Sequence, residues 1–252
     1  MVNIMKPIRI MSFNLWCGGV TPERTAKVFS AIADCDPDIL GVQEATPLWM
    51  NLLREQLPGY HAVGHGREGG DKGEYSAIFV RADRFDVLDE GTKWLTATPD
   101  VFSYVEDSLC PRVFTYAKLH DKDNNRDLNH INTHLDHGKD EVRLLQAHYL
   151  DKFINTLDLP VTVTGDFNCD EGTSTTYKFF TSGKIADSKF LAKDTVSAPT
   201  FHGYKNLEII IDFCFVSRDA YTVDSYRVID TLYDGEHPSD HNPVLVTLTP
   251  NA

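Results

Sequence analysis

Five short segments of the sequence end in side chains that can bind metal ions or transfer protons. Each places carboxylate, amide or imidazole groups directly after an apolar run: Phe13-Asn14, Gln43-Glu44, Asn132-Thr133-His134, Gly165-Asp166-Phe167-Asn168 and Ser239-Asp240-His241. A further acid, Asp212, lies inside an apolar run that begins at Ile209. Because rigid scaffolds present functional groups at strand ends, these residues predict one site built from distant parts of the chain.

Hydrolysis of a phosphate ester is the chemistry that this set of residues fits best. The ester and the attacking hydroxide are both anionic, so a divalent cation must neutralise charge, and carboxylates supply its oxygen ligands. Histidine takes up a proton near neutral pH, and amide groups can hold phosphate oxygens. The G-x-S-x-G motif of serine hydrolases and the H-E-x-x-H and H-x-x-E-H motifs of zinc hydrolases are absent, which disfavours both classes.

The elements that must position these groups alternate between strands and helices. The spacing of apolar residues predicts a helix over residues 22–33 after the N-cap candidate Thr21, and a second helix after the N-cap candidate Thr46. Further helices are predicted over 139–155 and near 173–181. Strands are predicted over residues 9–14, 38–44, 75–80, 87–95, 113–119, 128–133, 159–166, 208–216, 222–232 and 243–248. Strands this apolar must be covered on both faces, so the pattern favours two packed sheets flanked by helices.

In this order, the five segments resemble the motifs of the endonuclease/exonuclease/phosphatase superfamily. The pieces G-D-F-N at 165–168 and S-D-H-N-P-V at 239–244 are the most specific, and the resemblance spans nearly the whole chain. It implies a fold of the α/β (α+β) class, a DNase I-like four-layer α/β/β/α sandwich in which two mixed β-sheets pack face to face with helices outside. Since no linker or repeat divides the sequence, one domain over residues 1–252 is expected.

The resemblance also implies a metal site and a water site. Glu44 would be the main ligand of Mg²⁺, with Mn²⁺ as a substitute, and Asn14 and Asp240 would complete the metal site. Asp166 would orient the attacking water, and Asn168 would stabilise the pentacovalent phosphorus. Whether one or two metal ions act is left open.

Two histidines and two acids complete the implied machinery. His134 would hold or protonate a phosphate oxygen, and His241 would polarise the water, although whether Asp166 or His241 is the base is left open. Asp212 is expected to pair with His241, because an unpaired acid in so apolar a strand is costly. Glu74 resembles the acid that orients the first catalytic histidine, here His134, in the deoxyribonuclease branch.

Side chains outside these motifs are candidates for substrate binding. By the same resemblance, Arg112 lies where several branches place a phosphate-contacting arginine. His202 and Tyr204 lie in a loop where they could shape a substrate pocket or simply pack within the loop. Asp136 and His137 follow the third motif and could extend the site or form the turn into the next helix.

The charge balance limits the substrate and the partners. The chain has 24 Lys and Arg residues against 37 Asp and Glu residues, a formal net charge of −13, and no basic run. Because long nucleic acids are held mainly through neutralised phosphates, a long duplex is disfavoured. A small phosphorylated molecule is favoured, and a short single-stranded end, as for an exonuclease or a deadenylase, is the alternative.

A non-catalytic binding module on the same fold is the alternative from another class. Such a module would be expected to lack at least one metal-binding or base residue, whereas the whole set is present here. No protein partner is indicated by the sequence.

Cysteine usage and hydropathy bear on the compartment of the protein. The five cysteines are odd in number and widely spaced, without a C-x-x-C pair, which disfavours a disulfide framework or a zinc finger. Neither an apolar signal segment near Met1 nor an apolar run long enough to span a membrane occurs. A cytoplasmic protein is therefore expected.

Overall fold

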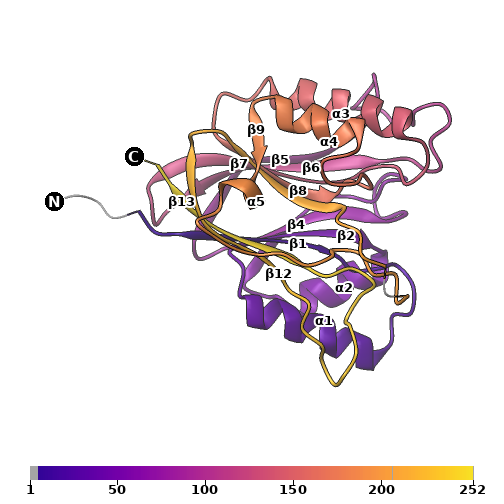
Figure 1. Ribbon diagram of the computed structural model, residues 1–252, viewed down its shortest axis with the longest axis vertical. Helices are drawn as coiled ribbons and strands as arrows, with labels where there is room; N and C mark the ends of the chain where they lie inside the picture. The colour runs from indigo at the N-terminus through magenta and orange to yellow at the C-terminus, as the bar shows by residue number, and fades with distance from the viewer. Residues whose placement is uncertain (1–4, 206, 252) are drawn as a thin grey trace.

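Two β-sheets packed face to face form the centre of the computed structural model, which describes residues 5–205 and 207–251 (Figure 1). Over these residues, one sheet has seven strands in the order β10-β12-β13-β1-β2-β4-β3: β1 Ile8–Asn14, β2 Ile39–Ala45, β3 Tyr60–Val63, β4 Tyr75–Arg81, β10 Asp194–Val196, β12 Tyr221–Val228 and β13 Val244–Pro250. The other has six strands in the order β5-β6-β7-β8-β11-β9: β5 Phe85–Trp94, β6 Val113–Asp121, β7 Arg126–His134, β8 Val161–Asp166, β9 Ile185–Asp187 and β11 Asp212–Ser217.

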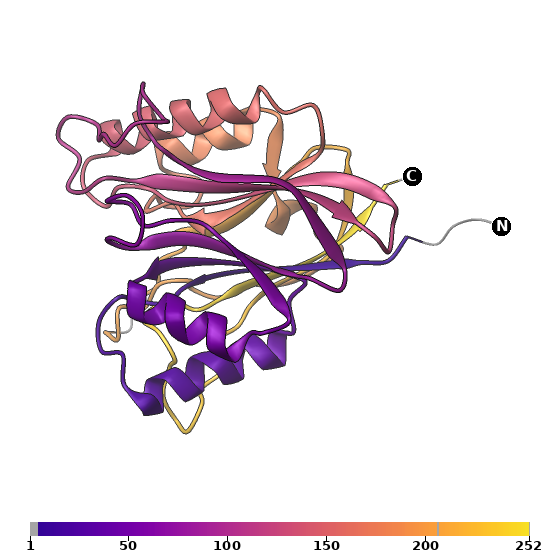
Figure 2. The ribbon, with the colours of Figure 1, turned by 180° about the vertical axis from the view of Figure 1, so that it is seen from behind.

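Helices cover the outer face of each sheet, so the molecule has four layers (Figures 1 and 2). The helices are α1 Pro22–Cys35, α2 Pro47–Gln56, α3 Asp140–Ile154, α4 Thr175–Ser182 and α5 Ser188–Leu191. Apolar side chains of α1 and α2 pack on the seven-stranded sheet, and those of α3 and α4 pack on the six-stranded sheet. The predicted four-layer α/β sandwich is confirmed. None of the helices in the described residues is long and apolar enough to cross a membrane.

The local sequence explains where the first two helices begin. Both start at a proline that follows a threonine, and proline at this position lacks an N–H group that the helix would leave unsatisfied. The side chain of Thr21 accepts a hydrogen bond from the N–H of Arg24 at 3.3 Å, and Thr46 accepts one from the N–H of Trp49 at 3.4 Å. Both N-caps therefore act as the sequence predicts.

Strand pairing brings the polar strand ends together at one edge of the sandwich. In the six-stranded sheet, β8 lies between β7 and β11, so Asp166 pairs with His134 on one side and with Asp212 on the other. In the seven-stranded sheet, the parallel strands β1 and β2 place Asn14 beside Gln43. Because β1 and β2, like β7 and β8, run parallel, the motifs that end them meet at the same edge.

Toward this edge the space between the sheets contains a polar bridge. Nδ2 of Asn132, on β7, donates hydrogen bonds to the carbonyl oxygens of Val42 at 2.8 Å and Ala77 at 2.9 Å in the opposite sheet. Nε2 of Gln43 donates to Oδ1 of Asn132 at 2.7 Å. Gly41 leaves the room that this bridge needs, since a Cβ atom there would lie 2.6 Å from the same Oδ1. The bridge fixes the spacing of the two sheets beneath the polar strand ends.

Several predicted boundaries differ from the structure. The strand predicted over 208–216 begins only at Asp212, because Ile209 pairs with Phe201 instead. The strand predicted over 222–232 ends at Val228. The short elements β3, β9, β10 and α5 are missing from the prediction, because three or four residues carry too little periodicity to identify an element.

Candidate active site

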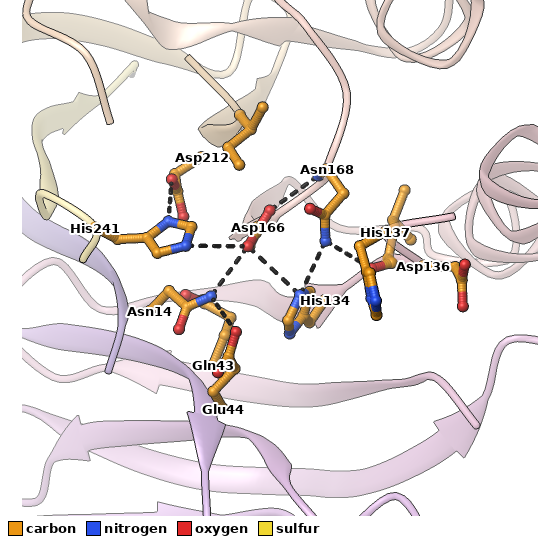
Figure 3. A network of polar contacts seen from close by, with 12 residues as sticks. Asn14, Gln43, Glu44, His134, Asp136, His137, Asp166, Asn168, Asp212 and His241 are labelled. Atoms are coloured by element: carbon orange, nitrogen blue, oxygen red, sulfur yellow. Dashed lines mark hydrogen bonds and ion pairs between the residues drawn. The ribbon is translucent and has the colours of Figure 1, made fainter. Parts of the chain in front are cut away.

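Asp166, at the end of β8, is the centre of a buried polar network (Figure 3). Its Oδ2 accepts a hydrogen bond from Nδ2 of Asn14 at 3.0 Å, and its Oδ1 accepts one from the backbone N–H of Asn168 at 2.9 Å. Nε2 of His134 lies 3.4 Å from Oδ2, and Nε2 of His241 lies 3.7 Å from the same atom. The Asp166 carboxylate thus lies beside side chains from three of the other four motifs.

His241 and Asp212 form a hydrogen-bonded pair beside Asp166. Nδ1 of His241 lies 2.8 Å from Oδ2 of Asp212, and both side chains are buried. Burial alone would lower the pKa of His241, but the Asp212 and Asp166 carboxylates raise it well above its usual value. Burial, followed by repulsion from Asp212, also raises the pKa of Asp166. The acid in the apolar strand therefore contacts the partner that the sequence predicts for it.

His134 is held as a neutral imidazole. Its Nε2 lies 3.0 Å from Nδ2 of Asn168, which also donates to the carbonyl oxygen of Leu135 at 3.0 Å, so Nε2 of His134 is the acceptor. Burial, with a further contribution from Arg112, lowers the pKa of His134 well below its usual value. The ring proton then resides on Nδ1, where it can be donated in a hydrogen bond without adding a positive charge.

A β-bulge positions Glu44 in the site. The pairing of β2 with β4 shifts register between Val42 and Ala45, and Glu44 lies within this shift in the left-handed conformation, with φ of 55°. Its Oε1 accepts a hydrogen bond from Nδ2 of Asn14 at 3.1 Å, and its Oε2 accepts one from the N–H of Cys17 at 2.9 Å. Burial opposes ionisation, but these hydrogen bonds lower the pKa of Glu44 and so keep the carboxylate charged.

Oxygen atoms around Glu44 fit a hard divalent cation. Burial raises the pKa of Asp240, His241 opposes this effect, and repulsion from Glu44 adds to it. Neighbouring carboxylates that repel one another are stabilised by a cation, and Mg²⁺ prefers carboxylate oxygens. Asp166, Asp212 and His241 also offer atoms within 4.8 Å of one another, but the hydrogen bond between Asp212 and His241 already uses two of them. Glu44 and Asp240 are therefore the better candidates for metal ligands.

Glu74 and Asn14 are both held by hydrogen bonds to other groups of the site. Glu74, expected beside His134, accepts two hydrogen bonds from the guanidinium of Arg67, at 2.7 and 2.9 Å. Within the described part of the chain, no hydrogen bond joins Glu74 to His134. Asn14, expected as a metal ligand, donates its Nδ2 hydrogens to neighbouring carboxylates, while its Oδ1 accepts from the N–H of Trp16 at 3.0 Å. Glu74 thus fixes Arg67 and Asn14 bridges two acids, while their roles as an orienting acid and a metal ligand stay predictions.

The cleft above this network has a volume of about 620 Å³ and draws residues from both sheets. Its acidic lining residues are Glu44, Glu74, Asp166 and Asp240, and its basic lining residues include Arg67 and Arg112. Arg112 lies in the wall of the cleft with only 4% of its surface exposed, and its contact with phosphate stays a prediction. Arg67 is missing from the prediction, although the half-buried Glu74 needs a cationic partner and Arg67 is the nearest arginine before it in the sequence.

His202 and Tyr204 lie beside the cleft rather than in it. Both line an adjoining cavity of about 480 Å³ together with Trp16, which also borders the cleft. The backbone N–H of His202 donates to the carbonyl oxygen of Asp240 at 3.1 Å. This loop therefore supports the Asp240 backbone, and its contribution to a substrate pocket stays a prediction.

A four-layer sandwich that gathers carboxylates, amides and histidines at one edge of both sheets defines a DNase I-like phosphoesterase. The chain matches the family model described as Endonuclease/Exonuclease/phosphatase family over residues 11–241, and it belongs to this family. The members of this family are metal-dependent hydrolases of phosphoesters. The family resemblance found in the sequence is thereby confirmed.

Solved structures from Bacteroides share the whole fold. An endonuclease/exonuclease/phosphatase family protein from Bacteroides thetaiotaomicron has 31% identity and a TM-score of 0.91, with 98% of this chain and 99% of that chain covered. The mannosyl-6-phosphatase Bt3783 of Bacteroides thetaiotaomicron VPI-5482 has 31% identity and a TM-score of 0.89, with coverage of 96% and 99%. The human Nocturnin catalytic domain, with 22% identity, a TM-score of 0.79 and coverage of 97% and 94%, shares the fold. The comparison with curated proteins gave no significant match.

Proposed function

We propose that this protein is a Mg²⁺-dependent hydrolase of small phosphoesters, with a phosphorylated sugar as the leading substrate class. The observation that carries this proposal is the position of Asp166. Its buried carboxylate lies between the Asp212–His241 pair and the amides and imidazole of Asn168 and His134. This arrangement can orient a water molecule next to groups that hold phosphate oxygens.

In this proposal, Glu44 and Asp240 would hold a Mg²⁺ ion, and Asn14 keeps Glu44 and Asp166 in place. When bound, the ion supplies positive charge that offsets the charge developing on the phosphate. Mn²⁺ is expected to substitute, because it also accepts carboxylate oxygens. The acidic cluster supports a hard cation and does not by itself select between these two metals.

The proposed reaction is an in-line attack of water on phosphorus. Asp166 orients the water and His241 polarises it, while Asp212 holds the imidazole of His241. The attack forms a new bond from the water oxygen to phosphorus and breaks the bond to the ester oxygen. The water proton passes to the Asp166–His241 pair and is later released to solvent, and the departing ester oxygen takes a proton from solvent. The raised pKa of Asp166 favours this carboxylate as the first proton acceptor.

The sides of the cleft offer groups for the phosphate oxygens. Nδ1 of His134 is a neutral donor, and the guanidinium of Arg112 adds positive charge at the same cleft. Asn168 donates both Nδ2 hydrogens, to His134 and to the Leu135 carbonyl, and so holds the imidazole in place. The formal charge of −13 and the likeness to a mannosyl-6-phosphatase both support a small substrate. We further propose that residues 1–252 act as one domain, because the cleft takes residues from both sheets.

A panel of esters tests this proposal. Purified protein would be assayed with Mg²⁺, with Mn²⁺ and with EDTA on p-nitrophenyl phosphate, a hexose phosphate, a short single-stranded RNA and a DNA duplex. We expect phosphate release from the two small esters, loss of release in EDTA, and little cleavage of the duplex. Preferred cleavage of the single strand would support the exonuclease alternative, and no metal-dependent hydrolysis of any ester would support a binding module.

A further inference from the structure

Trp16 stands between the catalytic cleft and a second cavity. It borders the cleft and also lines the adjoining cavity of about 480 Å³, here called the side cavity, whose other walls come from the start of α1 and from the loops around His202 and His237. The side cavity meets the cleft beside Asp240, because the N–H of His202 donates to the Asp240 carbonyl oxygen at 3.1 Å. A group attached to a phosphate in the cleft can therefore extend past Trp16 into the side cavity.

The indole of Trp16 is held in place by the loop that carries it. Its backbone is in the left-handed conformation, with φ of 55°, which a bulky residue adopts only where its surroundings enforce it. The guanidinium of Arg24 donates to the carbonyl oxygens of Leu15 at 2.7 Å, Trp16 at 2.9 Å and Gly19 at 2.9 Å, and it lies 5.1 Å from the centroid of the indole. A Cβ atom at Gly18 would lie 2.8 Å from the indole, so the loop packs closely against the ring. A ring fixed in this way loses little entropy when it binds a ligand.

Tyr204 extends the aromatic surface into the side cavity. Its ring meets that of Trp16 edge to face, with centroids 5.3 Å apart, and 47% of its surface is exposed. Nδ1 of His202 accepts a hydrogen bond from the N–H of Tyr204 at 3.1 Å, and burial lowers the pKa of His202 to about 4, so this imidazole adds no charge at neutral pH. The two aromatic rings therefore offer an accessible apolar surface next to the catalytic cleft.

The charged groups of the side cavity are matched to one another. The guanidinium of Arg24 is bound to backbone carbonyl oxygens, and the ammonium of Lys27 pairs with the carboxylate of Glu236. Glu23 lies at the start of α1, where its own N–H and the Thr21 hydroxyl lower the pKa of its carboxyl. Among the described residues of the side cavity, the arginine and the lysine thus already have partners. A second phosphate would gain little there, whereas hydroxyl groups can donate to the exposed carboxylates.

We propose that the side cavity binds the sugar ring of a phosphorylated sugar, with Trp16 and Tyr204 as the residues that determine specificity for this uncharged, hydroxyl-bearing group. A hexose ring has apolar C–H faces that can pack on an aromatic ring, and hydroxyl groups around its rim that match carboxylate acceptors. This inference rests on the proposed function and adds the place of the sugar and the residues that recognise it.

The test compares kcat/KM in Mg²⁺ for ethyl phosphate, a hexose 6-phosphate and a hexose 1,6-bisphosphate. The first two are primary alkyl esters, so they differ mainly in the group that reaches the side cavity. Wild-type protein is expected to prefer the hexose 6-phosphate over ethyl phosphate by at least about 10-fold, because contacts to a remote part of the substrate lower the barrier. It is expected to prefer it over the bisphosphate by about 10-fold, since the phosphate that is not cleaved would enter the side cavity.

Variants assign this preference to the aromatic pair. Trp16→Ala and Tyr204→Ala are each expected to lower kcat/KM for the hexose 6-phosphate by about 10-fold more than for ethyl phosphate, and Trp16→Phe should keep most of the preference. Phe190→Ala on α5 is the matched control, because this aromatic side chain is 67% exposed and lines neither the cleft nor the side cavity. Circular dichroism would confirm the fold, and Tyr204→Ala carries the test if Trp16→Ala does not fold.

The outcomes separate the two proposals. Equal use of ethyl phosphate and the hexose 6-phosphate, a preference for the bisphosphate or for adenosine 5′-monophosphate, or an unchanged preference in both folded alanine variants would overturn the inference and leave the proposed hydrolysis standing. A wild-type protein that hydrolyses none of these esters, nor p-nitrophenyl phosphate, in Mg²⁺ would overturn the proposed function itself.

Discussion

At the residue scale, the charge on Asp212 controls the protonation of His241. The two side chains lie 2.8 Å apart in a buried setting, where little solvent screens their attraction. Asp212→Asn keeps the shape of the side chain but removes this charge. We expect kcat to fall by about 100-fold or more, because His241 loses both its orientation and its raised pKa.

Two measurements would check this prediction together. Steady-state kinetics would give kcat, and an NMR titration would follow the imidazole of His241, whose pKa should fall in the variant. Asp187→Asn, which replaces a buried acid outside the cleft, is the control and should keep normal activity. An unchanged kcat in Asp212→Asn would show that the pair is structural.

Asp187 itself gives a prediction about stability and pH. Burial raises the pKa of its carboxyl from 3.8 to about 6, although the N–H of Lys189 and the Tyr177 hydroxyl both donate to it. The folded state therefore binds the proton more tightly than the unfolded chain. Its stabilising effect is complete below the unfolded pKa and is lost as the pH rises through about 6.

Replacement of Asp187 by Asn removes this dependence. Between about pH 4 and about pH 7, the unfolding free energy of the variant relative to wild type should rise by up to about 3 kcal/mol. Urea unfolding at both pH values would measure the change. A difference between the two proteins that does not vary with pH would contradict the prediction.

Site residues that follow an apolar run could be identified from the sequence, whereas a pairing that depends on the conformation of a loop could not. Glu44, Asp166 and His241 follow apolar runs, so their types and positions alone indicate a shared site. The pairing of Glu74 with Arg67 depends on how the loop between them folds, and no periodic pattern encodes that loop. For the same reason, the sequence left the orientation of His137 open.

At the element scale, the close approach of the two sheets depends on the absence of a side chain at Gly41. A Cβ atom there would lie 2.3 Å from Oγ1 of Thr164 and 2.6 Å from Oδ1 of Asn132, inside the polar bridge below the site. Gly41→Ala should therefore force the sheets apart and destabilise the protein by about 2 kcal/mol. Urea unfolding would measure the loss.

Gly59→Ala is the matched control for this prediction. A Cβ atom at Gly59 would have no other atom within 4 Å, so its substitution should leave the unfolding free energy nearly unchanged. Equal stability of Gly41→Ala and wild type would show that the space between the sheets adapts easily.

Element prediction succeeds where a segment is long and amphipathic or strongly apolar. The helices that begin after Thr21 and Thr46 and the strand that ends at Asp166 were found because capping and apolar runs are local signals. The bulge that positions Glu44 was not found, because the register of β2 against β4 is set by partners far away in the sequence. The sequence therefore identified candidate site residues but not the geometry that positions them.

At the scale of the whole molecule, the negative charge should exclude long nucleic acids. A formal charge of −13 repels a polyanion, and the four acids that line the cleft outnumber its two arginines. We expect no measurable binding of a long DNA duplex in an electrophoretic assay at about 0.15 M salt. Tight binding that weakens steeply with added salt would contradict this expectation.

The most direct test of the central claim compares Asp166→Ala with wild-type protein for phosphate release from a hexose phosphate and from p-nitrophenyl phosphate in Mg²⁺. Asp166 lies at the centre of the network, so its loss should lower turnover by at least about 100-fold while the protein stays folded. Glu44→Ala and His241→Ala should behave in the same way. EDTA should abolish wild-type release. Near-normal hydrolysis by pure Asp166→Ala protein, or full wild-type activity in EDTA, would contradict the account.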